Sequence, residues 1–150
     1  MAKYESSNLR NITMVGHGGT GKTSLCESLL FITGESDKLG RVDDASSTFD
    51  FEPEEQKRRI SISLAANFVE WDKRKVNMID TPGDTNFSFD TKYSLRVSDG
   101  AVIIIDAVGG VEFQTENVWG YADEFSLPRI IDIKNMKKER ADYFKVLEEY

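Results

Sequence analysis

Hydrophobic and polar residues alternate along the N-terminal part of this chain in a way that predicts a strand followed by a helix. Apolar residues are concentrated in 9–15, which predicts a strand running straight into a glycine-rich stretch. Within 22–32 the apolar positions recur at helical spacing, at Leu25, Leu29, Leu30 and Ile32. Gly34 follows this helix in the place of a C-terminal cap.

The next segment, from residue 35 to about 59, is polar and has no clear periodicity. A connection of that length in a compact domain is either functional or mobile. Beyond it, alternating apolar residues from Ile60 to Phe68 predict a strand, and Val76–Ile79 predicts another. The turn residues Asp72-Lys73-Arg74 between the two strands predict an antiparallel hairpin.

The second half of the chain predicts helices and strands in alternation. Helices are expected at about 87–97, 111–125 and 139–150, and strands at 101–106 and 129–133. The run 101–106 is β-branched and apolar, which is typical of a strand covered on both faces of a parallel sheet. Alternating strands and helices imply right-handed crossovers. The expected fold is therefore α/β, with a mostly parallel sheet and one antiparallel edge strand.

Composition limits the number of domains, the kinds of partner and the compartment that we expect for the chain. Its 150 residues fit one domain, and its net charge of −7 with scattered basic residues argues against direct RNA binding. The longest apolar run is far shorter than the roughly 18 residues that a membrane span needs. The first residues contain no secretory core, and the single cysteine, Cys26, fits a reducing compartment. We therefore expect a cytoplasmic domain that makes no membrane contact.

The glycine-rich stretch matches the P-loop pattern, in which two glycines separated by four residues are followed by Lys-Thr. It lies between a predicted strand and a predicted helix, as phosphate binding by backbone N–H groups and a helix N-terminus requires. Lys22 is expected to reach the β- and γ-phosphates of a nucleoside triphosphate, and the Thr23 hydroxyl to ligate Mg²⁺. The predicted nucleotide-binding residues here are Gly16, His17, Gly18, Gly19, Thr20, Gly21, Lys22, Thr23 and Ser24.

Magnesium requires a carboxylate in addition to the threonine, and Asp80 at the end of the second hairpin strand is the candidate. The three residues after it, Thr81, Pro82 and Gly83, complete an Asp-x-x-Gly turn whose glycine N–H is placed to contact a γ-phosphate. His17 is interpreted as a backbone contributor and Cys26 as a small core residue. The motif alone also suits an ATPase.

Nearly the whole chain resembles the N-terminal G domain of elongation factor G, and bacterial elongation-factor-G-like paralogues in particular. The resemblance is carried by 11–23, by 80–83, by 95–107 (Leu-Arg-Val-Ser-Asp-Gly-Ala-Val-Ile-Ile-Ile-Asp-Ala), and by shorter matches at 110–115, 127–129 and 139–144. It implies a P-loop G domain of three α/β/α layers that binds GTP and GDP with Mg²⁺, hydrolyses GTP and acts on the ribosome in translation. It further implies a first switch at about 35–61, a second at about 80–90, and Ser61 as an additional magnesium ligand.

Three departures from the family pattern change these expectations. Asp84 stands where the family has a histidine that positions the attacking water, so intrinsic hydrolysis is expected to be slow because the carboxylate adds negative charge. The guanine-reading motif Asn-Lys-x-Asp is replaced by Lys134, Asn135, Met136 and Lys137, and Lys137 can only donate hydrogen bonds. A shifted register would offer Asp132 or Asp142 instead. The chain is also expected to end before the family's last strand.

Two alternatives to a GTPase switch therefore remain open. One is a nucleotide-binding or interaction module that does not hydrolyse its ligand, favoured by Asp84 and Lys137. The other is an inactive fragment of a longer factor, which a cooperative unfolding transition would argue against.

Overall fold

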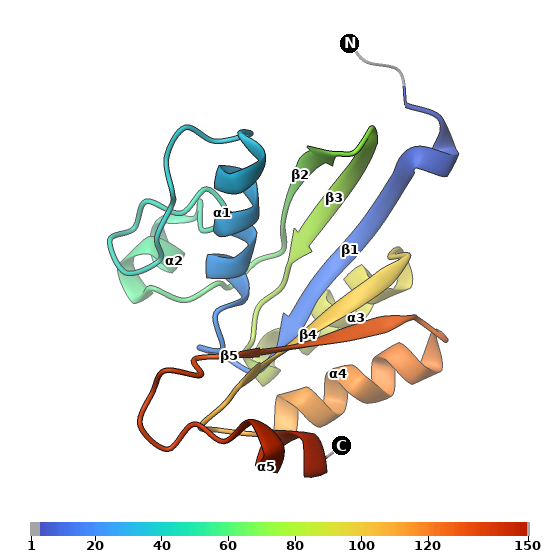
Figure 1. Ribbon diagram of the computed structural model, residues 1–150. Coiled ribbons are helices and arrows are strands. Elements are labelled where there is room, and N and C mark those ends of the chain that lie inside the picture. Colours follow the sequence, from blue (N-terminus) through green and yellow to red (C-terminus); the bar gives the residue numbers. More distant parts are fainter. Residues whose placement is uncertain (1–3, 150) are drawn as a thin grey trace.

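The computed structural model describes residues 4–149 and contains a five-stranded sheet flanked by helices (Figure 1). The strands follow the order β2-β3-β1-β4-β5 across the sheet. Strand β1 is parallel to β3 and β4, β4 is parallel to β5, and β2 is antiparallel to β3. The strands are β1 (Leu9–Gly16), β2 (Ala65–Trp71), β3 (Arg74–Asp80), β4 (Gly100–Asp106) and β5 (Arg129–Lys134). The predicted mostly parallel sheet with one antiparallel edge strand is confirmed.

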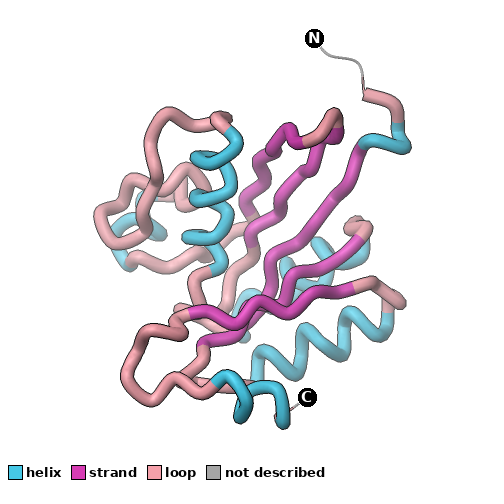
Figure 2. Tube along the Cα trace, viewed as in Figure 1, coloured by secondary structure: helices cyan, strands magenta, loops and turns pink. Residues whose placement is uncertain are grey.

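Helices cover both faces of this sheet and create two cores (Figure 2). The helices are α1 (Lys22–Thr33), α2 (Pro53–Arg58), α3 (Ser88–Arg96), α4 (Phe113–Glu124) and α5 (Tyr143–Glu148), with short 3₁₀ turns η1 (Ser6–Asn8) and η2 (Thr85–Phe87). Successive strand residues point to opposite faces, so Met14 joins the core under α1 while Val15 joins the core under α3, α4 and α5. The α/β/α layering follows from this alternation.

Buried apolar side chains explain why the elements dock where they do. Cys26 and Leu30 of α1 pack on Met78 of β3. On the other face, Leu95, Val118 and Val146 bring α3, α4 and α5 onto the fully buried β4 residues Ile103 and Ile105. The expectation that β4 is covered on both faces is confirmed, as is the core position of Cys26.

The prediction of a strand beginning at Ile60 was wrong, because β2 begins only at Ala65. The backbone N–H groups of Ile62 and Ser63 donate to the buried carboxylate of Glu55, at 2.8 and 2.9 Å, instead of to a neighbouring strand. A side chain therefore competes successfully with the sheet for these amides. The hairpin itself is confirmed: Asp72 and Lys73 both have positive φ, as a tight turn between twisted strands requires.

Helix α2 lies inside the segment that the periodicity left without structure. Pro53 occupies its first turn, acidic residues follow, and basic residues end it, so each end complements the helix dipole. The helix has only six residues, which is too short to show an apolar repeat. Its start signal was present in the sequence as Pro followed by Glu54 and Glu55.

The last two helices begin later than predicted. Gly110 has φ +69° and Glu112 is the N-cap, so α4 starts at Phe113 and not at Val111. In the final segment Arg140 has a left-handed conformation, and the Asp142 side chain accepts a hydrogen bond from the Lys145 N–H, so α5 starts at Tyr143. The end of the predicted helix, Tyr150, lies outside the described residues.

Replacing Glu55 with alanine is expected to destabilise the domain by about 2–4 kcal/mol. The Glu55 side chain is fully buried and accepts hydrogen bonds from the backbone of Glu52, Ile62 and Ser63. Removing it leaves these amides without an acceptor. Urea unfolding measures the free energy difference.

The neighbouring variant Glu54→Ala is the matched control. Glu54 is exposed, and its ion pair within residues 4–149 is with Arg58 on the helix surface, so its loss should cost about 0.5 kcal/mol or less. Equal effects of the two variants would contradict the anchoring role of Glu55.

Candidate nucleotide-binding site

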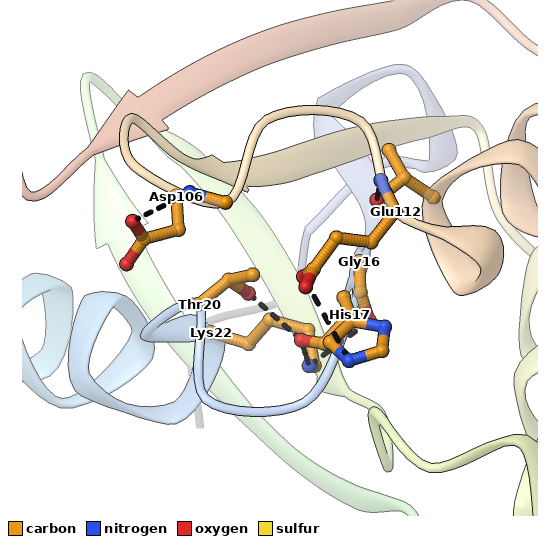
Figure 3. A network of polar contacts seen from close by, with 8 residues as sticks. Gly16, His17, Thr20, Lys22, Asp106 and Glu112 are labelled. Atoms are coloured by element: carbon orange, nitrogen blue, oxygen red, sulfur yellow. Dashed lines mark hydrogen bonds and ion pairs between the residues drawn. The ribbon is translucent and has the colours of Figure 1, made fainter. Parts of the chain in front are cut away.

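The loop between β1 and α1 has the backbone shape that a P-loop requires. Gly16, Gly19 and Gly21 all have positive φ, and a β-carbon on Gly16 would collide with the Ile104 carbonyl of β4. Thr20 Oγ1 donates to the His17 carbonyl at 3.0 Å and closes the loop. Figure 3 shows the loop curling around the Lys22 side chain. Glycine is therefore required here by backbone geometry as well as by contact with a phosphate.

Lys22 lies across the inside of this loop. Its Nζ donates to the Gly16 and His17 carbonyls, at 3.1 and 2.8 Å, and the side chain is almost fully buried. Burial lowers its pKa to about 8, with Asp80 opposing that shift. The ammonium group therefore stays largely charged at neutral pH and is held where an incoming phosphate can recruit it.

Thr23 and Asp80 meet directly although they come from α1 and β3. Thr23 Oγ1 donates to Asp80 Oδ2 at 2.6 Å, while Asp80 Oδ1 is buried and has no hydrogen-bond partner among residues 4–149. Burial raises the pKa of Asp80 to about 7, and the Thr23 hydrogen bond and Lys22 charge only partly offset it. An unpartnered buried carboxylate oxygen is costly unless a ligand satisfies it.

Ser61 also lies beside the Thr23–Asp80 pair. The sequence alone did not show whether Ser61 comes close to this pair. The Ser61 and Thr23 hydroxyls are 3.0 Å apart, and Ser61 Oγ donates to Asp50 Oδ1 at 2.7 Å. Burial raises the pKa of Asp50, and the charges of Glu55 and Glu27 add to that shift. Two hydroxyls and the Asp80 carboxylate thus converge, while the role of Ser61 as a metal ligand stays a prediction.

Among residues 4–149 there is no group of three or more His, Cys, Asp or Glu side chains suited to holding a metal ion. The donors present do fit Mg²⁺, which takes oxygen ligands and is held in nucleotide sites by one or two carboxylates together with substrate phosphates. The unpartnered Asp80 Oδ1 beside the Thr23 and Ser61 hydroxyls supplies that kind of donor set.

The turn after Asp80 is pressed against the P-loop. Thr81 Oγ1 donates to the Met14 carbonyl at 2.7 Å and ties the turn to β1. A β-carbon on Gly83 would lie 2.6 Å from the backbone nitrogen of Gly18 and would also collide with Lys22 Nζ. Only glycine fits, because the backbone of the Asp-x-x-Gly turn lies beside the phosphate-binding loop. The contact of the Gly83 N–H with a γ-phosphate stays a prediction. Pro82 sits in the same turn, and its carbonyl accepts a hydrogen bond from Thr91 of α3 at 3.3 Å.

Asp84 has a structural role that its sequence position did not reveal. Its Oδ1 accepts hydrogen bonds from the backbone N–H and the side-chain amide of Asn86, both at 2.8 Å, and so caps η2. Asp84 also lines the cavity beside the P-loop. The carboxylate is thus partly committed to holding the turn.

The segment in place of the guanine-reading motif is held by Asp106. Asn135 has φ +63°, and its side-chain amide donates to Asp106 Oδ2, as does Lys138 at 2.9 Å. The Lys134 stem passes Gly21, while Met136 and Lys137 are exposed. Asp132 lies half-buried within β5 and Asp142 caps α5, and their role as alternative base contacts stays a prediction.

The His17 imidazole lies beside Glu112, the N-cap residue of α4 (Figure 3). Its Nε2 lies 3.7 Å from Glu112 Oε2, which links the P-loop to the N-cap of that helix. The backbone of His17 serves Thr20 and Lys22 as an acceptor. The role of His17 as a backbone contributor to nucleotide binding stays a prediction.

These parts surround a cavity of about 450 Å³. Its walls come from the P-loop, from two residues of the polar segment (Val42 and Asp43), from 59–61 and from the turn after β3. The sequence interpretation missed the three buried carboxylates that hold this polar segment. Glu27 accepts from Ser47 and Thr48, Asp50 accepts from Ser61, and Glu55 accepts from 62 and 63. The sequence offered little to identify these carboxylates. They are charged residues in segments that pack against the rest of the domain.

A sequence model of the elongation factor Tu GTP binding domain matches residues 7–150 of this chain. The chain belongs to that family. This GTP-binding domain is 43% identical over 145 residues to elongation factor G 2 of Syntrophus aciditrophicus, and 44% identical over 141 residues to elongation factor G 1 of Treponema denticola. Those matches cover 97% and 94% of the domain but only 21% of each relative, so the chain spans about a fifth of their length.

A crystal structure of a protein from Thermus thermophilus has the same fold as the GTP-binding domain. It superimposes with a TM-score of 0.90 at 31% identity, over 96% of this chain and 22% of that one. No helix in the described part of the domain is both long enough and apolar enough to cross a membrane. The recognition of an elongation-factor-G-type G domain from the sequence is confirmed.

In the metal-free GTP-binding domain, the charge of Asp80 is expected to lower stability as the pH rises. The pKa of Asp80 is about 7 when folded and 3.8 ordinarily, so the folded state binds more protons between these values. Stability from this group is therefore lost as the pH rises through 7. Asp80→Asn keeps an acceptor for Thr23 without the charge, and should gain about 2–3 kcal/mol over the wild type between pH 5 and pH 8.

Urea unfolding in EDTA at several pH values measures this difference. Asp72→Asn, at an exposed position of the hairpin turn, serves as the control and should follow the wild-type pH profile. A constant gap between Asp80→Asn and the wild type at all pH values would contradict the raised pKa.

Proposed function

We propose that this chain is a GTP-binding switch domain of an elongation-factor-G-type translational GTPase, which binds GTP with Mg²⁺ and hydrolyses it to GDP slowly in isolation. The observation that carries the proposal is the convergence of Lys22, Thr23 and Asp80, with Ser61 and Gly83 beside them, around one cavity. The ribosome in the cytoplasm is the proposed place of action, because the matching relatives are named as elongation factors.

Phosphate binding begins at the P-loop backbone. The N–H groups of the loop and the first turn of α1 provide donors and the positive end of the helix dipole. Lys22 would exchange its two carbonyl acceptors for phosphate oxygens, which carry full negative charge and bind an ammonium more strongly. Bound Mg²⁺ would neutralise phosphate charge, held by Thr23, Asp80 and Ser61.

The two predicted switches are 35–61 and 80–90, and both contact the P-loop or the first turn of α1. Asp80, at the start of the second switch, accepts a hydrogen bond from Thr23. Ser61 reaches Thr23, and Gly83 lies against Gly18. A terminal phosphate between the P-loop and these residues would strengthen both contacts, and its loss would weaken both. This is the physical basis for proposing that the domain distinguishes GTP from GDP.

Base recognition is proposed to be weak. Lys137 replaces the aspartate that accepts two hydrogen bonds from guanine in the resembling family, and Asn135 is engaged by Asp106. Without that acceptor, discrimination against adenine loses the contact on which it depends. Phosphates and magnesium would then supply most of the affinity.

The Lys22→Ala variant tests the proposed function. Loss of the ammonium should weaken binding of a fluorescent GTP analogue in the presence of Mg²⁺ by about tenfold to a hundredfold. Lys145→Ala, on the exposed surface of α5, is the control and should bind like the wild type. Competition with unlabelled GTP and ATP in the same titration measures base preference, which should be within about tenfold. Equal binding by wild type and Lys22→Ala would overturn the proposed function.

A second function, a nucleotide-binding module without hydrolysis, is favoured by one observation. Asp84 caps η2 through Asn86, and a carboxylate at that position disfavours further negative charge in a transition state. Phosphate release from GTP by the isolated domain decides between the two functions. Slow release that Lys22→Ala abolishes supports the GTPase, whereas binding without any release supports the module.

A further inference from the structure

Arg59, at the end of α2, has a backbone conformation that arginine rarely adopts. It is the C-cap of the helix with φ +56° and ψ +41°, in the left-handed region that favours glycine. Its N–H donates to the Glu55 carbonyl at 2.6 Å, and the Ile60 N–H donates to the same oxygen at 3.3 Å. Residues in sparsely populated conformations persist where surrounding contacts enforce them, and they cluster at functional sites.

The Glu55 side chain holds the other end of this turn. Its buried carboxylate accepts hydrogen bonds from the backbone at 62 and 63, so the segment between α2 and β2 is fixed on both sides of Arg59. Two residues after Arg59, the Ser61 hydroxyl lies 3.0 Å from that of Thr23. Since two residues span at most about 7 Å, Arg59 is fixed close to the Thr23–Asp80 pair.

The charged side chains that line the cavity indicate which role Arg59 can have. The lysine and arginine residues among the described residues that line the cavity are Lys22 and Arg59, and they face the acidic residues Asp43 and Asp84. A nucleoside triphosphate brings several negative charges into this space. Phosphoryl groups are stabilised mainly by positioned positive charge, often from an arginine. Arg59 would therefore add to the positive charge that Lys22, the P-loop N–H groups and bound Mg²⁺ would supply.

Arg59 is also free to make this contact. Within residues 4–149 its guanidinium has no hydrogen-bond or ion-pair partner, whereas the neighbouring Arg58 pairs with Glu54. Residues 134–137, which replace the guanine motif, do not line the cavity, whereas Gly83 and Asp84 do. Arg59 thus belongs to the end of the site where a terminal phosphate would lie, and not to the base end.

We propose that Arg59 binds the terminal phosphate of the nucleoside triphosphate and supplies, from within the chain, positive charge that offsets Asp84. The inference rests on the proposed function, because it needs a triphosphate in the P-loop. Residues 59–61 would then respond to the presence of the terminal phosphate in two ways. Arg59 would contact the phosphate directly, and the Ser61 hydroxyl would lie beside the magnesium site.

Three variants test the proposal by binding. Fluorescent GDP and a non-hydrolysable fluorescent GTP analogue are titrated with Mg²⁺ into the wild type, Arg59→Gln, Arg59→Gly and Arg58→Gln. Loss of Arg59 should weaken triphosphate binding by about tenfold or more and leave diphosphate binding within about twofold. Arg58→Gln should change neither affinity.

Arg59→Gly guards against loss of folding, because glycine adopts the left-handed conformation without strain and should keep or raise the thermal unfolding midpoint. If Arg59→Gly and Arg59→Gln bind both nucleotides like the wild type, or lose both equally, the arginine does not recognise the terminal phosphate and the inference fails. If the wild type binds no more tightly than Lys22→Ala, the proposed function itself fails.

Discussion

The hydrogen bond from Thr23 to Asp80 is the contact around which the rest of the site is arranged. It joins the first turn of α1 to the end of β3, which are brought together only because β1 and β3 are parallel neighbours whose carboxyl ends meet at one edge of the sheet. The contact is buried and leaves one Asp80 oxygen without a partner among the described residues. Such an arrangement is costly in an isolated fold, and a bound cation would satisfy it.

A second set of buried carboxylates organises the chain between α1 and β2. Glu27 fixes 47 and 48, Asp50 fixes Ser61, and Glu55 fixes the turn after α2. Each carboxylate accepts hydrogen bonds from chain segments that would otherwise lie in solvent. The predicted first switch therefore adopts a defined path through side-chain acceptors of the protein itself, and its last residues reach the P-loop.

Three charged residues lie at the two ends of the proposed nucleotide site. At the base end, Lys137 stands where the resembling family has an acceptor, and at the phosphate end Asp84 adds a negative charge beside η2. Arg59 adds a positive charge across the same cavity at the expense of a strained backbone. Under the proposed function, these residues would weaken base recognition and change the balance of charge around the terminal phosphate.

The local features of this protein can be predicted from its sequence. The P-loop, the Asp80–Gly83 turn, the hairpin and the buried β4 were all predictable, because each depends on a short run of residues with its own backbone or burial requirement. The start of β2 and the neighbours of Ser61 and Asp84 could be known only from the folded structure. Those depend on Glu55, Asp50, Thr23 and Asn86 as hydrogen-bond partners, and a buried carboxylate cannot be told from a solvated one until the chain has folded around it.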